Sequence, residues 1–237
     1  KQPGAVTRRD PNKRVGCFHR GGSGGGDVLI LSGRKKKSHH RPIGKPKHQG
    51  STRRKHKTRQ KERGDPKGKS KPNDWADHYT RRARKENYPA RSVYKLKEIQ
   101  KKHRLIRIGH RVLDLGCAPG AWLLFAAETV GAGGWVMGID LKPVTIELPY
   151  YAQAVIADIN DDKADFRQKI GPPVDVILSD LAPATTGNKI VDAARSVTLC
   201  ETALAFARSH LVTGGAFVCK IFQGTDFTSY IESVKPL

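Results

Sequence analysis

The chain has 237 residues, 37% of them hydrophobic, and a formal net charge of +22. No stretch approaches the ~20 apolar residues of a membrane-spanning helix, and no signal-peptide pattern opens the chain. We therefore expect no membrane attachment and a cytoplasmic location. The length allows one catalytic domain with an appendage, provided that the hydrophobic residues are concentrated in one region.

The positive charge is concentrated in the first 110 residues. Residues 1–74 hold 23 Lys and Arg against 5 Asp and Glu, residues 75–110 hold 11 against 3, and residues 111–237 hold 10 against 14. A basic region beside a slightly acidic one indicates a polyanionic partner such as RNA, DNA or a ribosome. The alternative is a basic tail that is only solvated.

Residues 1–74 are rich in Lys, Arg, Gly, Pro and His and lack apolar periodicity. This composition predicts a disordered, low-complexity tail, in which only Val28 to Leu31 has the character of a short strand. The folded domain is expected over residues 75–237.

The segment that follows mixes aromatic and basic residues. Val93, Leu96 and Ile99 recur at helical spacing, which predicts a helix from about Arg91 to Lys102 with Lys95 on another face. Three tyrosines lie among the arginines of this segment: Tyr79, Tyr88 and Tyr94. They have two interpretations of equal weight, as stacking platforms for unpaired bases or as apolar anchors onto the domain.

Strands and helices alternate after Arg111. Strands are expected at 112–116, 135–140, 153–158, 174–179 and 215–221, with helices from about 120, near 163–170 and at about 190–210. Strands joined by crossover helices indicate an α/β fold with a mostly parallel, doubly wound sheet. Polar residues recur at the strand ends: Asp114, Asp140, Asp158, Asp180 and Lys220. Because ligands bind outside the carboxyl ends of such strands, these side chains predict one pocket.

The loop from Gly116 to Gly120 follows a strand and opens a helix. Glycines permit close backbone approach and the helix start offers free N–H donors, which suits a nucleotide-like ligand. The loop is neither GxGxxG nor a P-loop. Asp140, about 20 residues further on, is placed to bind ribose hydroxyls.

The four cysteines of the chain are irregularly spaced and form no CxxC pair. We expect them to be reduced and structural, and we expect no metal site.

The strand, the DLGxxPG loop and the second strand ending in an acid resemble class I S-adenosylmethionine-dependent methyltransferases, which have a Rossmann-like fold. Four ordered motifs, ARSVYKLKEIQ, VLDLGCAPGAW, SDLAPATTG and GGAFVCKIFQGTDF, resemble more narrowly the FtsJ/RrmJ family of ribose 2′-O-methyltransferases. The resemblance covers roughly Asp74 to the C-terminus. It implies S-adenosylmethionine as cofactor, bound by Asp114, Gly116, Pro119, Gly120, Trp122, Asp140, Asp158 and Asp180.

The same resemblance implies a catalytic Lys-Asp-Lys-Glu tetrad. Its first three members fall on Lys95, Asp180 and Lys220, whereas the glutamate has no counterpart and Glu232 lies too early to replace it. Lysine is unusual late in a parallel strand, because such strands are normally apolar on both faces. We expect Lys220 to act as general base, Asp180 to orient it, and Lys95 to contact a phosphate or the developing alkoxide.

Three positions depart from the family pattern: Ala121 and Leu123 after the glycine loop, and Ala184 in place of an asparagine. The resemblance also implies a helix and a hairpin that add two strands beside the strand of Lys220. The helix is expected to begin near Thr225, but the two strands do not follow it, so we expect a C-terminally truncated domain and an unprotected edge at the strand of Lys220.

The expected function is methyl transfer to a ribose 2′-hydroxyl, on a uridine of large-subunit (23S-type) ribosomal RNA, by a monomer that acts on ribosomal RNA or the large subunit. The alternatives are a tRNA or other rRNA ribose methyltransferase, a non-catalytic RNA-binding assembly factor, and a nicotinamide oxidoreductase. The missing GxGxxG argues against the last.

Overall fold

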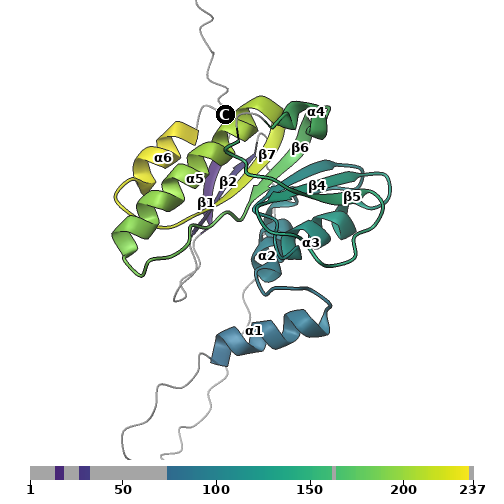
Figure 1. Ribbon diagram of the computed structural model, residues 1–237, viewed down its shortest axis with the longest axis horizontal. Coiled ribbons are helices and arrows are strands. Elements are labelled where there is room, and N and C mark those ends of the chain that lie inside the picture. The colour runs from purple at the N-terminus through teal and green to yellow at the C-terminus, as the bar shows by residue number, and fades with distance from the viewer. Residues whose placement is uncertain (1–13, 19–26, 33–73, 162–163, 235–237) are drawn as a thin grey trace, which may run out of the picture.

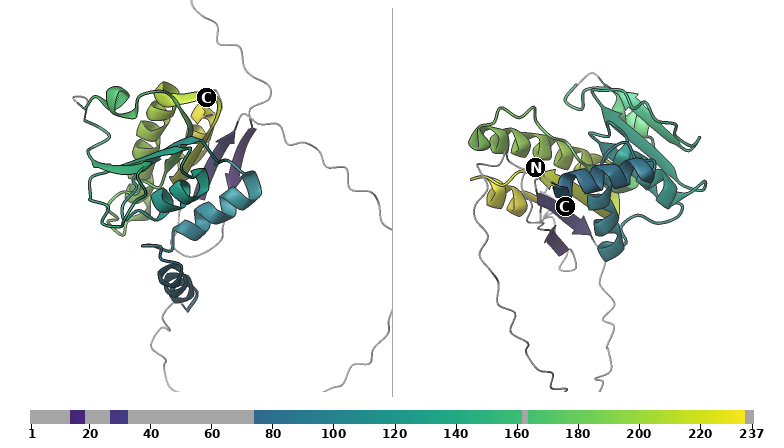
Figure 2. Two further views of the ribbon diagram at one scale, coloured as in Figure 1. Left: turned by 90° about the vertical axis from the view of Figure 1, so that its right-hand side faces the viewer. Right: turned by 90° about the horizontal axis from the view of Figure 1, so that it is seen from below.

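The computed structural model describes residues 14–18, 27–32, 74–161 and 164–234. A seven-stranded sheet, in the order β1-β2-β7-β6-β3-β4-β5, forms the middle of three layers, with helices on both faces (Figures 1 and 2). The strands are β1 (Arg14–Phe18), β2 (Asp27–Ser32), β3 (Arg111–Leu115), β4 (Trp135–Asp140), β5 (Ala152–Ile156), β6 (Val174–Ser179) and β7 (Leu211–Ile221). The helices are α1 (Asp74–Lys85), α2 (Val93–His103), α3 (Ala121–Val130), α4 (Phe166–Ile170), α5 (Lys189–His210) and α6 (Phe227–Val234).

Strands β3 to β7 form the parallel part of the sheet. β3 pairs with β4 on one side and with β6 on the other, and β5 and β7 extend the sheet outward. The doubly wound topology is thereby confirmed, with each strand within a few residues of its expected bounds. The chain reverses its direction of winding between β3 and β6, which is where an open α/β sheet forms a ligand crevice at its carboxyl edge.

Two apolar cores fill the spaces on either side of the sheet. Val28, Val112 and Val218 face α2 and α3, whereas Leu29 and Phe217 face α5 and its neighbours. The helical periodicity expected in α2 is confirmed, since Val93, Leu96 and Ile99 are at most 1% exposed. Both faces of the sheet are therefore covered, as near-continuous apolar runs in parallel strands predict.

Strand β2 corrects two expectations about the chain ends. It pairs antiparallel with β7 from Asp27, opposite Ile221, to Ser32, opposite Ala216, and β1 pairs with its other edge. The strand of Lys220 is therefore not an unprotected edge. The expected boundary at residue 74 does not separate β1 and β2 from the sheet, and the strand character of Val28 to Leu31 is confirmed. The other residues before 74 lie outside the described ranges.

Helix α1 and the turn after it join α2 through a small cluster around Tyr88 and Tyr94. The two rings are only 6% and 7% exposed, so these tyrosines anchor the segment instead of offering a free stacking surface. Glu86 bridges the helices, because it accepts from Arg82 Nε at 2.7 Å and from Lys97 Nζ at 2.8 Å. These two bonds lower the pKa of Glu86 to about 2.

Two further properties concern the described part of the chain. None of its helices combines the length and apolarity needed to cross a bilayer. Cys117, Cys200 and Cys219 are buried free thiols, and burial raises the pKa of Cys117. These three thiols agree with the structural role expected for the cysteines, whereas the side chain of Cys17 lies outside the described part of the chain.

Leu29→Ala tests whether β2 is integral to the fold. Leu29 is 0% exposed within the α5-side core, so its truncation should lower the free energy of unfolding by about 2–5 kcal/mol, measured by urea denaturation. Gln153→Ala, at an exposed position on the opposite edge strand β5, should change it by less than about 0.5 kcal/mol. Equal stability of both variants would show that β2 does not pack against β7.

Candidate active site

The carboxyl edge of the parallel strands collects the charged residues that the sequence predicts. Asp114 lies in β3, Asp140 ends β4, Asp180 directly follows β6 and Lys220 is the penultimate residue of β7. Asp158 lies two residues beyond β5, where it is exposed and accepts from the backbone and side-chain amides of Asn160. The site thus runs along one edge, with Asp158 at its outer end.

The glycine loop between β3 and α3 is built for close backbone approach. Gly116 and Gly120 have positive φ values of 78° and 108°. A Cβ on Gly116 would lie 2.9 Å from Leu181, and one on Gly120 would lie 2.7 Å from Ile146. Side chains at both positions are therefore excluded, and the first turn of α3, next to exposed Pro119, offers backbone N–H groups that lack partners within the helix.

Asp140 ties this loop to β4. One carboxylate oxygen accepts from the Ala118 N–H and the other from the Lys142 N–H, both at 2.9 Å. Each oxygen retains a second lone pair, so the residue can still accept hydroxyl donors from a ligand. Leu141, the next residue, is 68% exposed and offers an apolar surface beside it.

Asp114 lies beneath the loop and has an unusual environment. It is 0% exposed, and neither carboxyl oxygen has a hydrogen-bond partner among the described residues. Burial, reinforced by the neighbouring charges of Asp180 and Asp140, raises the pKa of Asp114 well above its ordinary value. Both oxygens of this buried carboxyl group are therefore available to a hydrogen-bond donor or a cation of a ligand.

Lys220 and Asp180 form the central ion pair of the site. The Lys220 Nζ donates to the Asp180 carboxylate and, at 2.9 Å, to the Asp180 backbone oxygen. Their side chains are only 16% and 19% exposed, so solvent screening is weak. The structure places these two predicted residues together, at the crevice between β3 and the β6–β7 pair.

Lys95 comes from a different layer of the molecule. It lies half-buried in the first turn of α2, and its backbone N–H donates to the Ser92 carbonyl at 3.0 Å. The same carbonyl accepts from Trp122 Nε1 at 2.9 Å. The first turn of α2 is therefore fastened to the start of α3.

This contact changes the interpretation of Trp122, which the sequence assigns to cofactor binding. Its side chain is 2% exposed and points toward Ser92, so only its backbone is placed to contact a ligand at the glycine loop. Ser92 itself escaped the sequence analysis. The available signal was a serine directly before the apolar period of the helix, the usual mark of a helix start.

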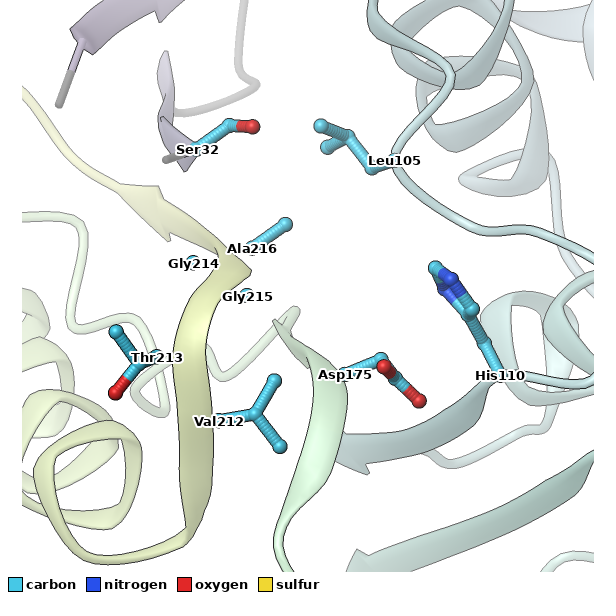
Figure 3. A pocket seen from close by; sticks show the side chains of 9 residues that line it. All are labelled: Ser32, Leu105, His110, Asp175, Val212, Thr213, Gly214, Gly215 and Ala216. Atoms are coloured by element: carbon cyan, nitrogen blue, oxygen red, sulfur yellow. The ribbon is translucent and has the colours of Figure 1, made fainter. Parts of the chain in front are cut away.

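A hollow of about 140 Å³ lies at the other end of the sheet, and Figure 3 shows the side chains that line it. It is lined by Asp175 at the start of β6, by His110 before β3 and by Ser32 at the end of β2. Asp175 and His110 lie at the amino ends of parallel strands, and Ser32 ends the antiparallel strand β2 at the same edge of the sheet. The hollow is thus separate from the edge that carries Asp180 and Lys220.

These features together define a class I methyltransferase site. A loop that excludes side chains, an acid placed for hydroxyl groups, an exposed leucine beside it and an unpartnered buried carboxyl fit S-adenosylmethionine, with its adenosine and its cationic methionine part. Gly116, Gly120, Asp140 and Asp114 would hold it. Residues 88–237 match the FtsJ-like methyltransferase family, and the chain belongs to that family.

Known proteins of similar sequence are named as methyltransferases of ribosomal RNA. The chain is 55% identical over 170 residues to the ribosomal RNA large subunit methyltransferase E of Desulforapulum autotrophicum, covering 71% of this chain and 84% of that protein. The protein of the same name from Bdellovibrio bacteriovorus is 44% identical over 161 residues, covering 67% and 82%. A solved ribosomal RNA methyltransferase from Plasmodium falciparum is 27% identical, with a TM-score of 0.54 over 60% of this chain and 82% of that one. The expected Rossmann-like methyltransferase fold is thereby confirmed.

Trp122→Phe tests the link between α3 and α2. Phenylalanine keeps the apolar ring but loses the N–H donor, so we expect methyl-transfer turnover to fall about 3–10-fold, the effect of one neutral hydrogen bond. The affinity for S-adenosylmethionine, measured by calorimetry, should stay within about two-fold if the ring acts only through Ser92. Trp135→Phe at the start of β4 is the matched control. A large loss of cofactor affinity would show that the Trp122 side chain contacts the cofactor.

Asp114→Asn tests the protonation of the buried acid. The unfolded-state pKa is about 3.9 and the folded-state pKa is higher, so titration of the carboxyl does not affect stability at low pH and destabilises the fold increasingly as pH rises between the two values. We expect the variant to match the wild type near pH 4 in urea denaturation and to exceed it at pH 7, by up to about 1.4 kcal/mol for each pH unit. A wild type that is more stable at pH 7 would show an ionised carboxyl.

Proposed function

We propose that this protein transfers a methyl group from S-adenosylmethionine to a ribose 2′-hydroxyl of large-subunit ribosomal RNA, in the cytoplasm, during ribosome assembly. The Lys220–Asp180 pair beside the glycine loop is the observation that carries the proposal. The names of the relatives, which refer to the ribosomal RNA large subunit, support the choice of RNA. The uridine target and a monomeric state stay predictions from sequence.

A ribose hydroxyl is a weak nucleophile, so its attack on a methyl group requires a base. The cofactor supplies a methyl group on a sulfonium sulfur, which keeps the bonding electron pair when the methyl leaves. We assign the hydroxyl proton to the Lys220 Nζ in its neutral form.

Lys95 is the second cation of the site in this proposal. Its ammonium group would stabilise the charge that develops on the 2′-oxygen or hold the adjacent phosphate. The basic residues of α1 and α2, Arg81, Arg82, Arg84, Lys101 and Lys102, extend from the same helices and suit a phosphate backbone. RNA binding at these helices would bring its ribose toward the site edge.

The primary experiment is tritiated methyl transfer to isolated large ribosomal subunits that lack ribose methylation. After nuclease digestion, mass spectrometry should find the label on one 2′-oxygen. Naked ribosomal RNA and tRNA serve as parallel substrates, because label on tRNA instead would identify the alternative ribose methyltransferase. Binding of S-adenosylmethionine without transfer to any of the three RNAs would favour a non-catalytic assembly factor, and binding of NAD in its place an oxidoreductase.

Substitutions of the two lysines test their assigned roles. Lys220→Arg keeps a cation near Asp180 but cannot accept a proton at neutral pH, so turnover should fall at least about 100-fold. Lys95→Ala should reduce turnover strongly, whereas Lys101→Ala, at an exposed position in the last turn of the same helix, should change RNA affinity at most. All three should bind S-adenosylmethionine like the wild type. Full turnover by Lys220→Arg would contradict its role as base.

A further inference from the structure

Strand β2 brings a buried acid to the catalytic edge from the other end of the sequence. Because β2 runs antiparallel to β7, its first residues lie beside the last residues of β7. Val28 is the register partner of Lys220, and Asp27 is the partner of Ile221. Asp27 is only 6% exposed. A carboxylate is rarely buried to this degree unless polar groups compensate it.

Asp27 is bonded to the turn that follows the catalytic strand. The side-chain amide of Gln223, three residues after Lys220, donates to the Asp27 carboxylate. On the opposite side of this turn, the Phe222 N–H donates to Ser196 Oγ of α5 at 3.0 Å. The exit of β7 is thus held between two elements, β2 and α5.

Lys220 depends on this exit for its position. Asp180 holds the Nζ at the tip of the Lys220 side chain. The geometry of this bond also requires that the backbone at the end of β7, which carries Lys220, stays in place. A hydrogen bond to a charged group is about twice as strong as a neutral one. The bond between Asp27 and Gln223 therefore restrains the backbone that carries the proposed base.

We propose that Asp27 is a positioning residue of the methyl-transfer site, acting on Lys220 through Gln223 and the turn after β7. This inference rests on the proposed function. It makes β2 a working part of the active site, although it lies in the basic segment that composition assigns to a tail. In this role Asp27 contacts neither the reacting atoms nor the cofactor. Its substitution should therefore lower turnover and leave cofactor affinity unchanged.

The test compares three single variants in the full chain. Asp27→Ala removes the acceptor and should lower the turnover of methyl transfer about 10-fold or more, with S-adenosylmethionine affinity within about two-fold of the wild type. Asp27→Asn keeps an oxygen that accepts from Gln223 and should retain most of the turnover. Ser32→Ala, at the other end of β2 beside the hollow of Figure 3, is the matched control and should leave turnover unchanged.

A double-mutant cycle separates positioning from loss of fold. If Asp27 acts through Gln223, then Gln223→Ala should reproduce the loss, and the double variant should be no slower than either single variant. If Asp27→Ala does not fold, Gln223→Ala alone carries the test because it leaves β2 intact. Wild-type turnover in Asp27→Ala or in Gln223→Ala, additive losses, or an equal loss in Ser32→Ala would overturn the inference. A wild type that methylates no RNA would instead overturn the proposed function on which it rests.

Discussion

The active site depends on β7 being hydrogen-bonded along both of its edges. β6 pairs with one edge and β2 with the other, and Cys200 Sγ of α5 also contacts the Lys220 carbonyl, at 3.2 Å. A strand end that is paired on both sides has little freedom to fray. The proposed mechanism needs Lys220 within hydrogen-bond reach of a hydroxyl in a defined direction, so a small displacement of this strand would cost much of the rate. The position of one lysine is therefore a property of the whole sheet.

The acids at the carboxyl edge are not equivalent, although they look alike in sequence. Asp114 is buried with a raised pKa, Asp180 forms an ion pair with Lys220, and Asp140 accepts from two backbone N–H groups. Each environment stabilises a different state of the same functional group. The edge is thus less negative than a count of its aspartates suggests.

The parallel part of the fold was predictable because local patterns dictate it. Apolar runs that end in Asp140 or Asp180 mark strands and their carboxyl ends at once, and the spacing of Val93, Leu96 and Ile99 fixes the buried face of α2. The contacts of Asp27 and the indole of Trp122 were not predictable by these means. Asp27 has a partner far away in sequence, within a segment whose composition resembles a tail. Trp122 belongs to a loop with a strong ligand-binding pattern, and only the packing of α2 shows that its N–H points elsewhere.

Pairing of β2 with β7 has a consequence for how the chain folds during synthesis. Asp27 and Gln223 are separated by 196 positions, so β2 leaves the ribosome long before its partner strand exists. Contacts of such high sequence separation are slow to form, and β2 must wait while the sheet from β3 to β6 assembles. During this interval Leu29 and Ile30 have no core to enter. The Lys and Arg residues that are dense in the sequence around β2 would oppose association of this strand with other copies of the chain, since like charges repel.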